Sequence, residues 1–220
     1  MVRKENFTYY LSVEGETEKY YFEHLRDIIN ADPTSVRTFV LRCDVEKNPL
    51  SYAKRKNACS IERIAHICDY ESKEDCHVRN FTDVLENLVK AREIKRLDYK
   101  LGYSNFTFEL WMVLHMQNCC CCLTHRSQYL SHVNKAFDEK FAKLDEYKRE
   151  DDFKRCLKKI GVNEVRAAVE RAETILAEKE KNGIHETEYK KFSYFTDNPS
   201  MSIHKVVKEI LDLAYKTKRA

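Results

Sequence analysis

The six residues 13–18, Val-Glu-Gly-Glu-Thr-Glu, constrain the fold more than any other stretch of the chain. They separate an apolar run at 7–13, typical of a buried strand, from a run at 19–29 with apolar residues at helical spacing. Gly15 falls at the junction, where we expect an unusual pair of backbone dihedral angles. Strand, tight turn and helix place Glu14 at the carboxyl end of a strand, the edge where open α/β sheets bind ligands. Glu18 follows one helical turn later.

Two carboxylates at one turn repel each other unless a cation or a shared proton relieves them. Acidic residues at a helix start also complement the helix dipole. That second interpretation suits Glu16 better than Glu14, because Glu14 precedes the helix. Both interpretations remain open from this stretch alone.

Strand-like and helix-like patterns alternate through the first half of the chain. Further strands are expected at 36–43, 63–69 and 96–103, with a helix at about 80–94 and a loop or helix at 48–60. This alternation predicts an α/β fold with a parallel, mostly buried sheet flanked by helices.

From residue 105 onward the pattern becomes helical. Residues 106–116 are apolar almost all round, as in a buried helix. The further helices are expected at 127–148, 151–159, 163–182 and 200–216. We therefore predict an α/β domain at 1–104 and a helical region at 105–220 packed on it.

The composition limits the classes of function. The net charge of +3 is too small for a strongly basic nucleic-acid coat. The first six residues lack the apolar core of a signal peptide, and no run reaches the ~18 apolar residues of a membrane span. The chain has 9 Cys without such a signal, which indicates a reducing, cytoplasmic location and no membrane association.

Two acidic clusters end two of the predicted strands, Glu14 with Glu18 and Asp69 with Glu71. Parallel strands bring their carboxyl ends to one edge, so the clusters converge if the two strands are neighbours. A site built from carboxylates alone suits Mg²⁺ or Mn²⁺, which prefer oxygen ligands and typically serve phosphoryl chemistry.

A glutamate in a Val-Glu-Gly turn followed by a strand with an acidic-x-acidic end resembles the Toprim domain of topoisomerases, primases and certain nucleases. Three blocks narrow the resemblance: VEGETEKYYFEHL at 13–25, FELWMVLH at 108–115 and NPSMSIHKVVKEI at 198–210. In this order they are similar to the RloB-like family, Toprim proteins associated with bacterial restriction and phage-defence loci.

The resemblance implies roles for particular residues. Glu14 matches the Toprim glutamate, which serves acid/base chemistry or metal binding. Asp69 matches the first acid of the usual Asp-x-Asp pair, and Glu71 stands where the second Asp is usual. Glu109 and His115 match the glutamate and histidine of the Phe-Glu-Leu-Trp block. Glu18 is a further candidate metal ligand.

The implied activity is Mg²⁺- or Mn²⁺-dependent hydrolysis of DNA or RNA phosphodiesters in anti-phage defence, including abortive infection, with other proteins of the defence locus as partners. The alternative is a non-catalytic nucleic-acid-binding or sensor module with the same fold. Lys100 and Arg96 belong to a basic stretch that approaches the proposed edge, and they are candidate phosphate contacts together with His115. His115 is equally well explained as a core histidine.

Glu109 and the run Cys119 to Cys122 can each be interpreted in more than one way. Glu109 lies in an apolar helix, so its carboxylate must face a metal, a basic partner or the helix start. The run Cys119 to Cys122 suggests zinc, but four consecutive cysteines cannot wrap one tetrahedral ion, and no second cysteine pair is evident. Thiols without a metal are the expectation there.

Overall fold

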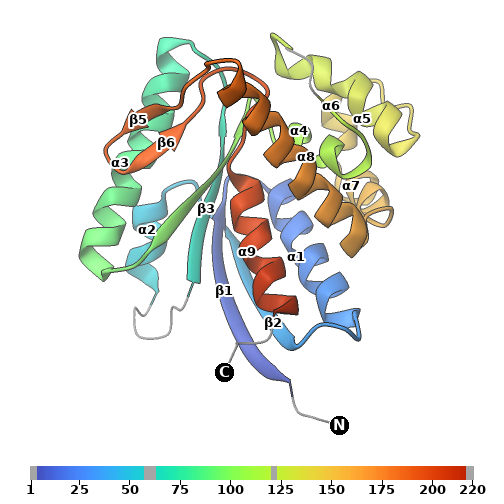
Figure 1. Cartoon of the computed structure of the whole chain (residues 1–220), viewed down its shortest axis with the longest axis horizontal. Helices are drawn as coiled ribbons and strands as arrows, with labels where there is room; N and C mark the ends of the chain where they lie inside the picture. The colour runs from blue at the N-terminus through green and yellow to red at the C-terminus, as the bar shows by residue number, and fades with distance from the viewer. Residues whose placement is uncertain (1–3, 57–62, 120–122, 217–220) are drawn as a thin grey trace.

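The computed structural model describes residues 4–56, 63–119 and 123–216 of the chain. Four parallel strands form a sheet in the order β2-β1-β3-β4 (Figure 1). The strands are β1 (Glu5–Val13), β2 (Arg37–Val45), β3 (Arg63–Tyr70) and β4 (Tyr99–Asn105). The predicted α/β class, a parallel sheet flanked by helices with a helical C-terminal half, is confirmed.

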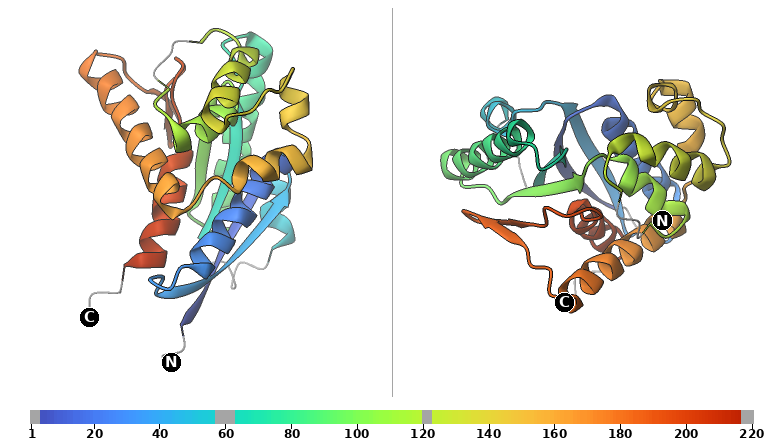
Figure 2. Two further views of the ribbon diagram at one scale, coloured as in Figure 1. Left: turned by 90° about the vertical axis from the view of Figure 1, so that its right-hand side faces the viewer. Right: turned by 90° about the horizontal axis from the view of Figure 1, so that it is seen from above.

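Helices cover both faces of this sheet (Figure 2). One face carries α1 (Glu16–Ala31) and α9 (Ile203–Tyr215), and the other carries α2 (Pro49–Arg55) and α3 (Asp75–Lys95). On β3, Ala65 and Ile67 face the first layer, whereas Ile64 and Cys68 face the second. This alternation follows from the twofold period of a strand, and burial on both sides explains the nearly continuous buried run of β3.

The second half of the chain is helical and shares its hydrophobic core with the sheet. Leu11 of β1, Trp111 and Val207 belong to one continuous cluster of buried side chains. The remaining elements are α4 (Glu109–Met116), η2 (Arg126–Gln128), α5 (Tyr129–Phe137), α6 (Leu144–Tyr147), α7 (Glu150–Leu157), α8 (Val162–Lys181), β5 (Thr187–Tyr189) and β6 (Phe192–Tyr194). Within the described ranges, no helix is both long and apolar enough to span a bilayer.

Several predicted elements differ from the structure. The helix expected at 127–148 is divided into η2, α5 and α6, because Asp138 adopts a left-handed conformation, with φ 48°, and ends α5. β4 begins at Tyr99 rather than Arg96, since Arg96 has φ 52° and caps the end of α3. The antiparallel hairpin of β5 and β6 was not expected, and its strands have only three residues each.

The strand order fixes where a ligand site can lie. The chain leaves β1 through α1 on one face of the sheet and leaves β3 through α3 on the other face. β1 and β3 are neighbours, so their connections diverge and open a crevice at their carboxyl ends. Open α/β sheets bind ligands at such topological switch points. Glu14 and Asp69 lie at this one.

Candidate functional site

The carboxyl ends of β1 and β3 bring two of the predicted acids into contact. Glu14 follows the last residue of β1, and its Oε2 accepts a hydrogen bond of 3.1 Å from the Asp69 backbone N–H. Asp69 is the seventh residue of β3, and both carboxylates are half-buried. The contact joins two segments that lie 55 residues apart in the chain.

Glu18 lies behind this pair in the first turn of α1. Its side chain is buried, and its Oε2 accepts a hydrogen bond of 3.0 Å from the Thr17 hydroxyl. Gly15 has an extended backbone, with φ −146°, so the unusual dihedral angles predicted for it are absent. A Cβ at Gly15 would lie 2.9 Å from Glu18 Oε2. The glycine therefore leaves room for the Glu18 carboxylate.

Glu109 reaches the same site from the helical half, at the first residue of α4. It is fully buried, and it accepts a hydrogen bond from the Thr107 hydroxyl. Its other oxygen, Oε1, lies 3.1 Å from Lys148 Nζ in an ion pair. The carboxylate thus has the basic partner that a buried acid needs.

Lys148 follows α6 and is the ammonium group that faces the cluster most directly. Burial lowers the pKa of Lys148, but Glu109, with smaller effects of Asp69 and Glu18, raises it above its ordinary value. Its side chain keeps 38% of its surface exposed. One half-exposed cation therefore balances several enclosed carboxylates.

Glu71 forms the outer rim of the site with His77 of α3. The Glu71 side chain is exposed, and its Oε2 lies 2.9 Å from His77 Nε2. The other ring nitrogen of His77 hydrogen-bonds the Ser72 hydroxyl at 2.7 Å. A cavity of about 240 Å³ is lined by Glu14, Lys47, Asp69, Glu71, His77, Asn80, Phe81 and Val84.

The acids of the cluster favour their protonated forms. Burial raises the pKa of Glu14 to about 7, with a further contribution from Glu18 and an opposing one from the Asp69 N–H. Burial also raises the pKa of Asp69 well above its usual range, reinforced by Glu14, Glu18 and Glu109. For Glu18, burial is again the main cause of a raised pKa, with Glu109 adding to it. Like charges in a shared, poorly solvated site have this effect.

A protein-family model described as RloB-like protein matches residues 9–210. The chain belongs to the RloB-like family. The match covers the second half of β1, the other three strands of the sheet, the whole of α4 and most of α9. No curated protein and no solved structure matches the chain.

The donor set of this RloB-like protein has the oxygen chemistry of a hard divalent cation site, although no three of its carboxylates bring their ligand atoms within 4.8 Å of one another in the described part of the chain. Glu14, Asp69 and Glu71 line one cavity, and the charges of Glu18 and Glu109 act on Asp69 from α1 and α4. Carboxylate oxygens are the ligands that Mg²⁺ and Mn²⁺ prefer. A bound cation would offset both the burial and the mutual repulsion that raise the pKa values of Glu14, Asp69 and Glu18.

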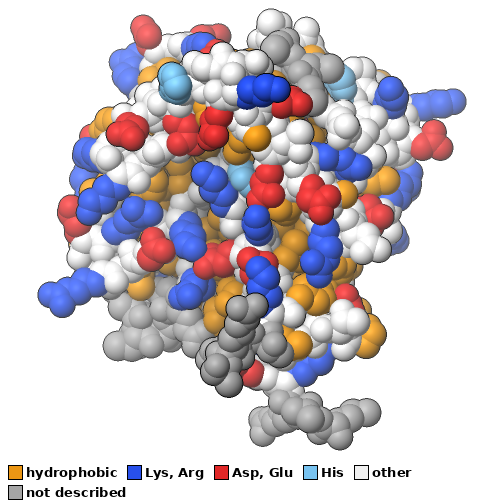
Figure 3. Space-filling model, viewed as in Figure 1, with side chains coloured by type: hydrophobic (Ala, Val, Ile, Leu, Met, Phe, Trp, Pro, Cys, Tyr) orange, Lys and Arg blue, Asp and Glu red, His pale blue; other side chains and the backbone are white. Residues whose placement is uncertain are grey.

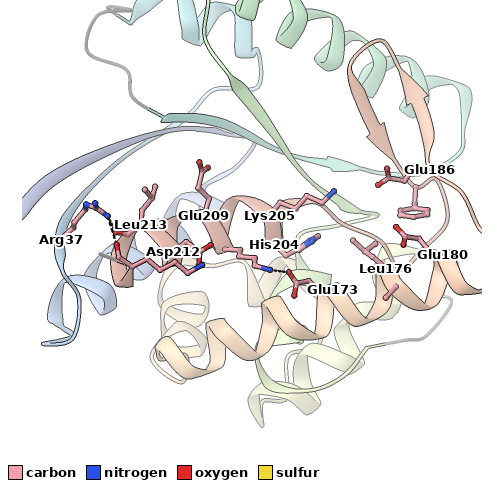
Figure 4. A pocket seen from close by; sticks show the side chains of 14 residues that line it. Arg37, Glu173, Leu176, Glu180, Glu186, His204, Lys205, Glu209, Asp212 and Leu213 are labelled. Atoms are coloured by element: carbon pink, nitrogen blue, oxygen red, sulfur yellow. Dashed lines mark hydrogen bonds and ion pairs between the residues drawn. The ribbon is translucent and has the colours of Figure 1, made fainter. Parts of the chain in front are cut away.

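The structure places Lys100 and Arg96 away from these acids. Lys100 pairs in register with Ala65 near the start of β3, at the amino ends of the strands, and its Nζ lies 2.8 Å from Glu209 Oε1. The premise that Lys100 lies near the carboxyl end of its strand is wrong, because β4 begins three residues later than expected. Glu209 lines a separate groove between α8 and α9 (Figure 4).

His115 is a core residue. Only 1% of its surface is exposed, and its ring nitrogens bond the Tyr21 hydroxyl at 3.1 Å and the Trp111 carbonyl at 2.9 Å. Burial lowers the pKa of His115 to about 3, so the ring is neutral at physiological pH. The expected nucleic-acid contact of His115 is corrected by this enclosure.

Most of the cysteine run lies outside the described part of the chain. Cys119 is buried, and Cys120 to Cys122 lie outside the described residues. Among the residues that the structure describes, one trio of side chains of metal-ligating type has its ligand atoms within 4.8 Å of one another: Glu74, Cys76 and His77. Glu74 and Cys76 are exposed at the start of α3, and His77 already bonds Ser72 and Glu71. This trio is a polar helix start.

Proposed function

We propose that this RloB-like protein is a divalent-metal-dependent nuclease that hydrolyses nucleic-acid phosphodiesters. The observation that carries the proposal is the contact of Glu14 with Asp69 at the topological switch point, with Glu18 and Glu109 enclosed behind it. The resemblance of Val13–Gly15 and of the Asp69-x-Glu71 pair to the Toprim domain supports the same activity.

Glu14, Asp69 and Glu71 would hold Mg²⁺ or Mn²⁺, with Glu18 and Glu109 as further ligands. The ion, when bound, would polarise the phosphodiester and make a water molecule more acidic. A pKa of about 7 suits Glu14 to the alternative role of general base, because such a group both takes up and releases protons near neutral pH.

Lys148 holds Glu109 in place and contributes a positive charge at the site of phosphate attack. The family resemblance supports a role for this activity in bacterial anti-phage defence, with other proteins of the same locus as proposed partners.

A non-catalytic binding or sensor module is the second candidate. The observation in its favour is Glu71, which is longer than the usual aspartate, exposed, and paired with His77. Such a module would bind the metal and nucleic acid without turnover.

Cleavage assays with matched variants test the proposal. Plasmid, single-stranded DNA and total RNA are incubated with the protein and Mn²⁺ or Mg²⁺, with EDTA as the blank. Glu14→Gln and Asp69→Asn should each lower the cleavage rate about 100-fold or more. Glu16→Gln is the control, because Glu16 lies in the same turn but is exposed and paired with Lys19 at the surface.

Calorimetric titration with Mn²⁺, read together with the cleavage assay, separates the two candidates. A nuclease and a sensor should both bind Mn²⁺, and Glu14→Gln should weaken the binding in either case. Turnover that persists in Asp69→Asn, or in EDTA, would exclude the proposed mechanism. Metal binding without cleavage of any of the three substrates would favour the sensor.

A further inference from the structure

Three neighbouring hollows lie along the carboxyl edge of the sheet, and each shares lining residues with the next. The first, of about 240 Å³, holds Glu14 and Asp69. The second, of about 200 Å³, shares Glu71 and His77 with the first. The third, of about 730 Å³, shares Ser72, Glu74, Phe106 and Thr124 with the second. A path therefore leads from the acidic cluster into a larger cavity about three times its volume.

Phe106 lies where the second and third hollows meet, in a strained turn. Its φ is +64°, a left-handed value that is a genuine outlier for a bulky side chain. The Thr107 N–H donates to the Asn105 carbonyl at 2.8 Å, which closes a three-residue γ-turn around Phe106. Turns of this hand are rare and strained. The Phe106 N–H, bonded to the Tyr70 carbonyl at 2.7 Å, fixes the turn to the end of β3.

Packing accounts for only part of this phenylalanine, since Phe106 lies against the main core cluster but keeps part of its surface exposed. Its neighbour Phe108 is fully buried, whereas Phe106 is only half-buried and lines both hollows. Glycine at this position would adopt the same backbone without strain. Strain that persists beside an acidic site points to a role for the side chain there.

Two cationic side chains line the first two hollows, so a polyanion bound there would have only a few phosphate contacts. Lys47 lines the first hollow and Arg126 the second, and neither has an ion-pair partner among the described residues. Glu71 and Glu74 lie between them, so the path is not uniformly basic. Basic and acidic side chains are likewise mixed over the face of the molecule in Figure 3. Phosphate contacts alone are too few to grip a duplex along its length.

We propose that an unpaired nucleic-acid strand lies in this path, with a nucleobase stacked on the Phe106 ring and the adjoining bases in the apolar hollow beyond it. Lys47 and Arg126 contact the phosphates on either side of Glu71. This inference rests on the proposed nuclease function, since it assigns that site its substrate class. A paired base cannot offer its face to a side chain, whereas bases of a single strand stack readily on aromatic rings.

Binding measurements with Phe106 variants test the stacking. Fluorescent oligothymidylate, oligouridylate and a short DNA duplex are titrated with the full-length protein, with Ca²⁺ in place of Mg²⁺. Phe106→Gly removes the ring and the strain together, and affinity for both single strands should fall about tenfold. Phe106→Trp should restore the affinity. Phe7→Leu is the control for Phe106→Leu, because Phe7 is also half-buried against the same core but lies near the amino end of β1.

The outcomes separate the two proposals. Loss of single-strand binding in Phe106→Gly and Phe106→Leu, with rescue by Phe106→Trp and unchanged duplex binding, supports the stacking platform. Equal losses on the DNA and RNA strands identify the shared base-and-phosphate chemistry, and a loss on one alone identifies a dependence on the sugar or on the thymine methyl group. If the Phe106 variants bind single strands as the parent does, while Glu14→Gln still abolishes cleavage, the stacking inference fails and the nuclease proposal stands. If Glu14→Gln also cleaves normally, the nuclease proposal fails as well.

Discussion

Lys148 is the residue whose charge most directly balances the enclosed acids. It lies 3.1 Å from Glu109, whose side chain has no exposed surface. Lys148→Met should therefore destabilise the metal-free protein by about 1–3 kcal/mol, less than for a fully buried pair because Lys148 is partly exposed. Mn²⁺ should restore most of the loss, since a bound cation replaces the missing charge.

Melting curves with and without Mn²⁺ measure this effect. Lys143→Met is the matched control, because Lys143 precedes the same short helix, is exposed, and has no ion-pair partner in the described part of the chain. Equal melting temperatures for the two variants in EDTA would show that Lys148 does not stabilise the enclosed acids.

Glu14 should make the stability of the metal-free protein depend on pH. The folded-state pKa of Glu14 is raised from 4.5 to about 7, so the native protein binds the proton more tightly than the unfolded chain. Stability contributed by the protonated carboxyl is present at low pH and is lost as the pH rises from about 4.5 to about 7. The parent should lose on the order of 2–3 kcal/mol relative to Glu14→Gln across this window.

Urea denaturation in EDTA at several pH values tests the sign. The difference in stability between the parent and Glu14→Gln cancels, to first order, the pH dependence that the other titrating groups contribute. These groups include Asp69 and Glu18, whose pKa values are also raised. Saturating Mg²⁺ should abolish the difference above pH 7. A parent that gains stability relative to Glu14→Gln as the pH rises would contradict the burial of this carboxyl.

At the scale of elements, the sequence predicted the strands that carry the acids and missed the elements that complete the site. The β1–α1 junction and the end of β3 follow from local apolar patterns, so the placement of Glu14 and Asp69 was predictable. The start of β4 was not, because a left-handed Arg96 ends α3 where the pattern alone continues. Because of that error, Lys100 was predicted near the carboxyl ends of the strands, whereas it lies near their amino ends.

Lys148 had no local signal. It lies in a charged stretch that reads as a solvated surface, and its position beside Glu109 depends on how α5 and α6 divide a pattern that looks like one helix. His77 was missed for a similar reason, since α3 begins at Asp75, five residues before its apolar face becomes evident. Contacts between distant segments depend on where each helix begins and ends, and the periodicity of apolar residues in one sequence does not show these positions.

At the scale of the whole molecule, the two halves are joined by one core and by one site. Trp111 of α4 and Val207 of α9 pack in the same cluster as Leu11 and Ile67 of the sheet. Residues 1–104 alone would expose that face of the sheet and lose Glu109 and Lys148. We expect this fragment to show no cooperative unfolding and no Mn²⁺ binding by calorimetry, because the apolar area lost is a large part of the net stability of a domain.

Complementation makes the fragment experiment decisive. Co-expression of 1–104 with 105–220 should restore a cooperative melting transition and Mn²⁺ binding, since the break falls at the end of β4, before the turn at Phe106. The same pair with Glu109→Gln should recover the melting transition and bind Mn²⁺ more weakly than the unaltered pair, because the shape is kept while one ligand charge is lost. A fragment 1–104 that folds and binds Mn²⁺ with the affinity of the full chain would show that the sheet alone forms the site, and that Glu109 serves only the start of α4.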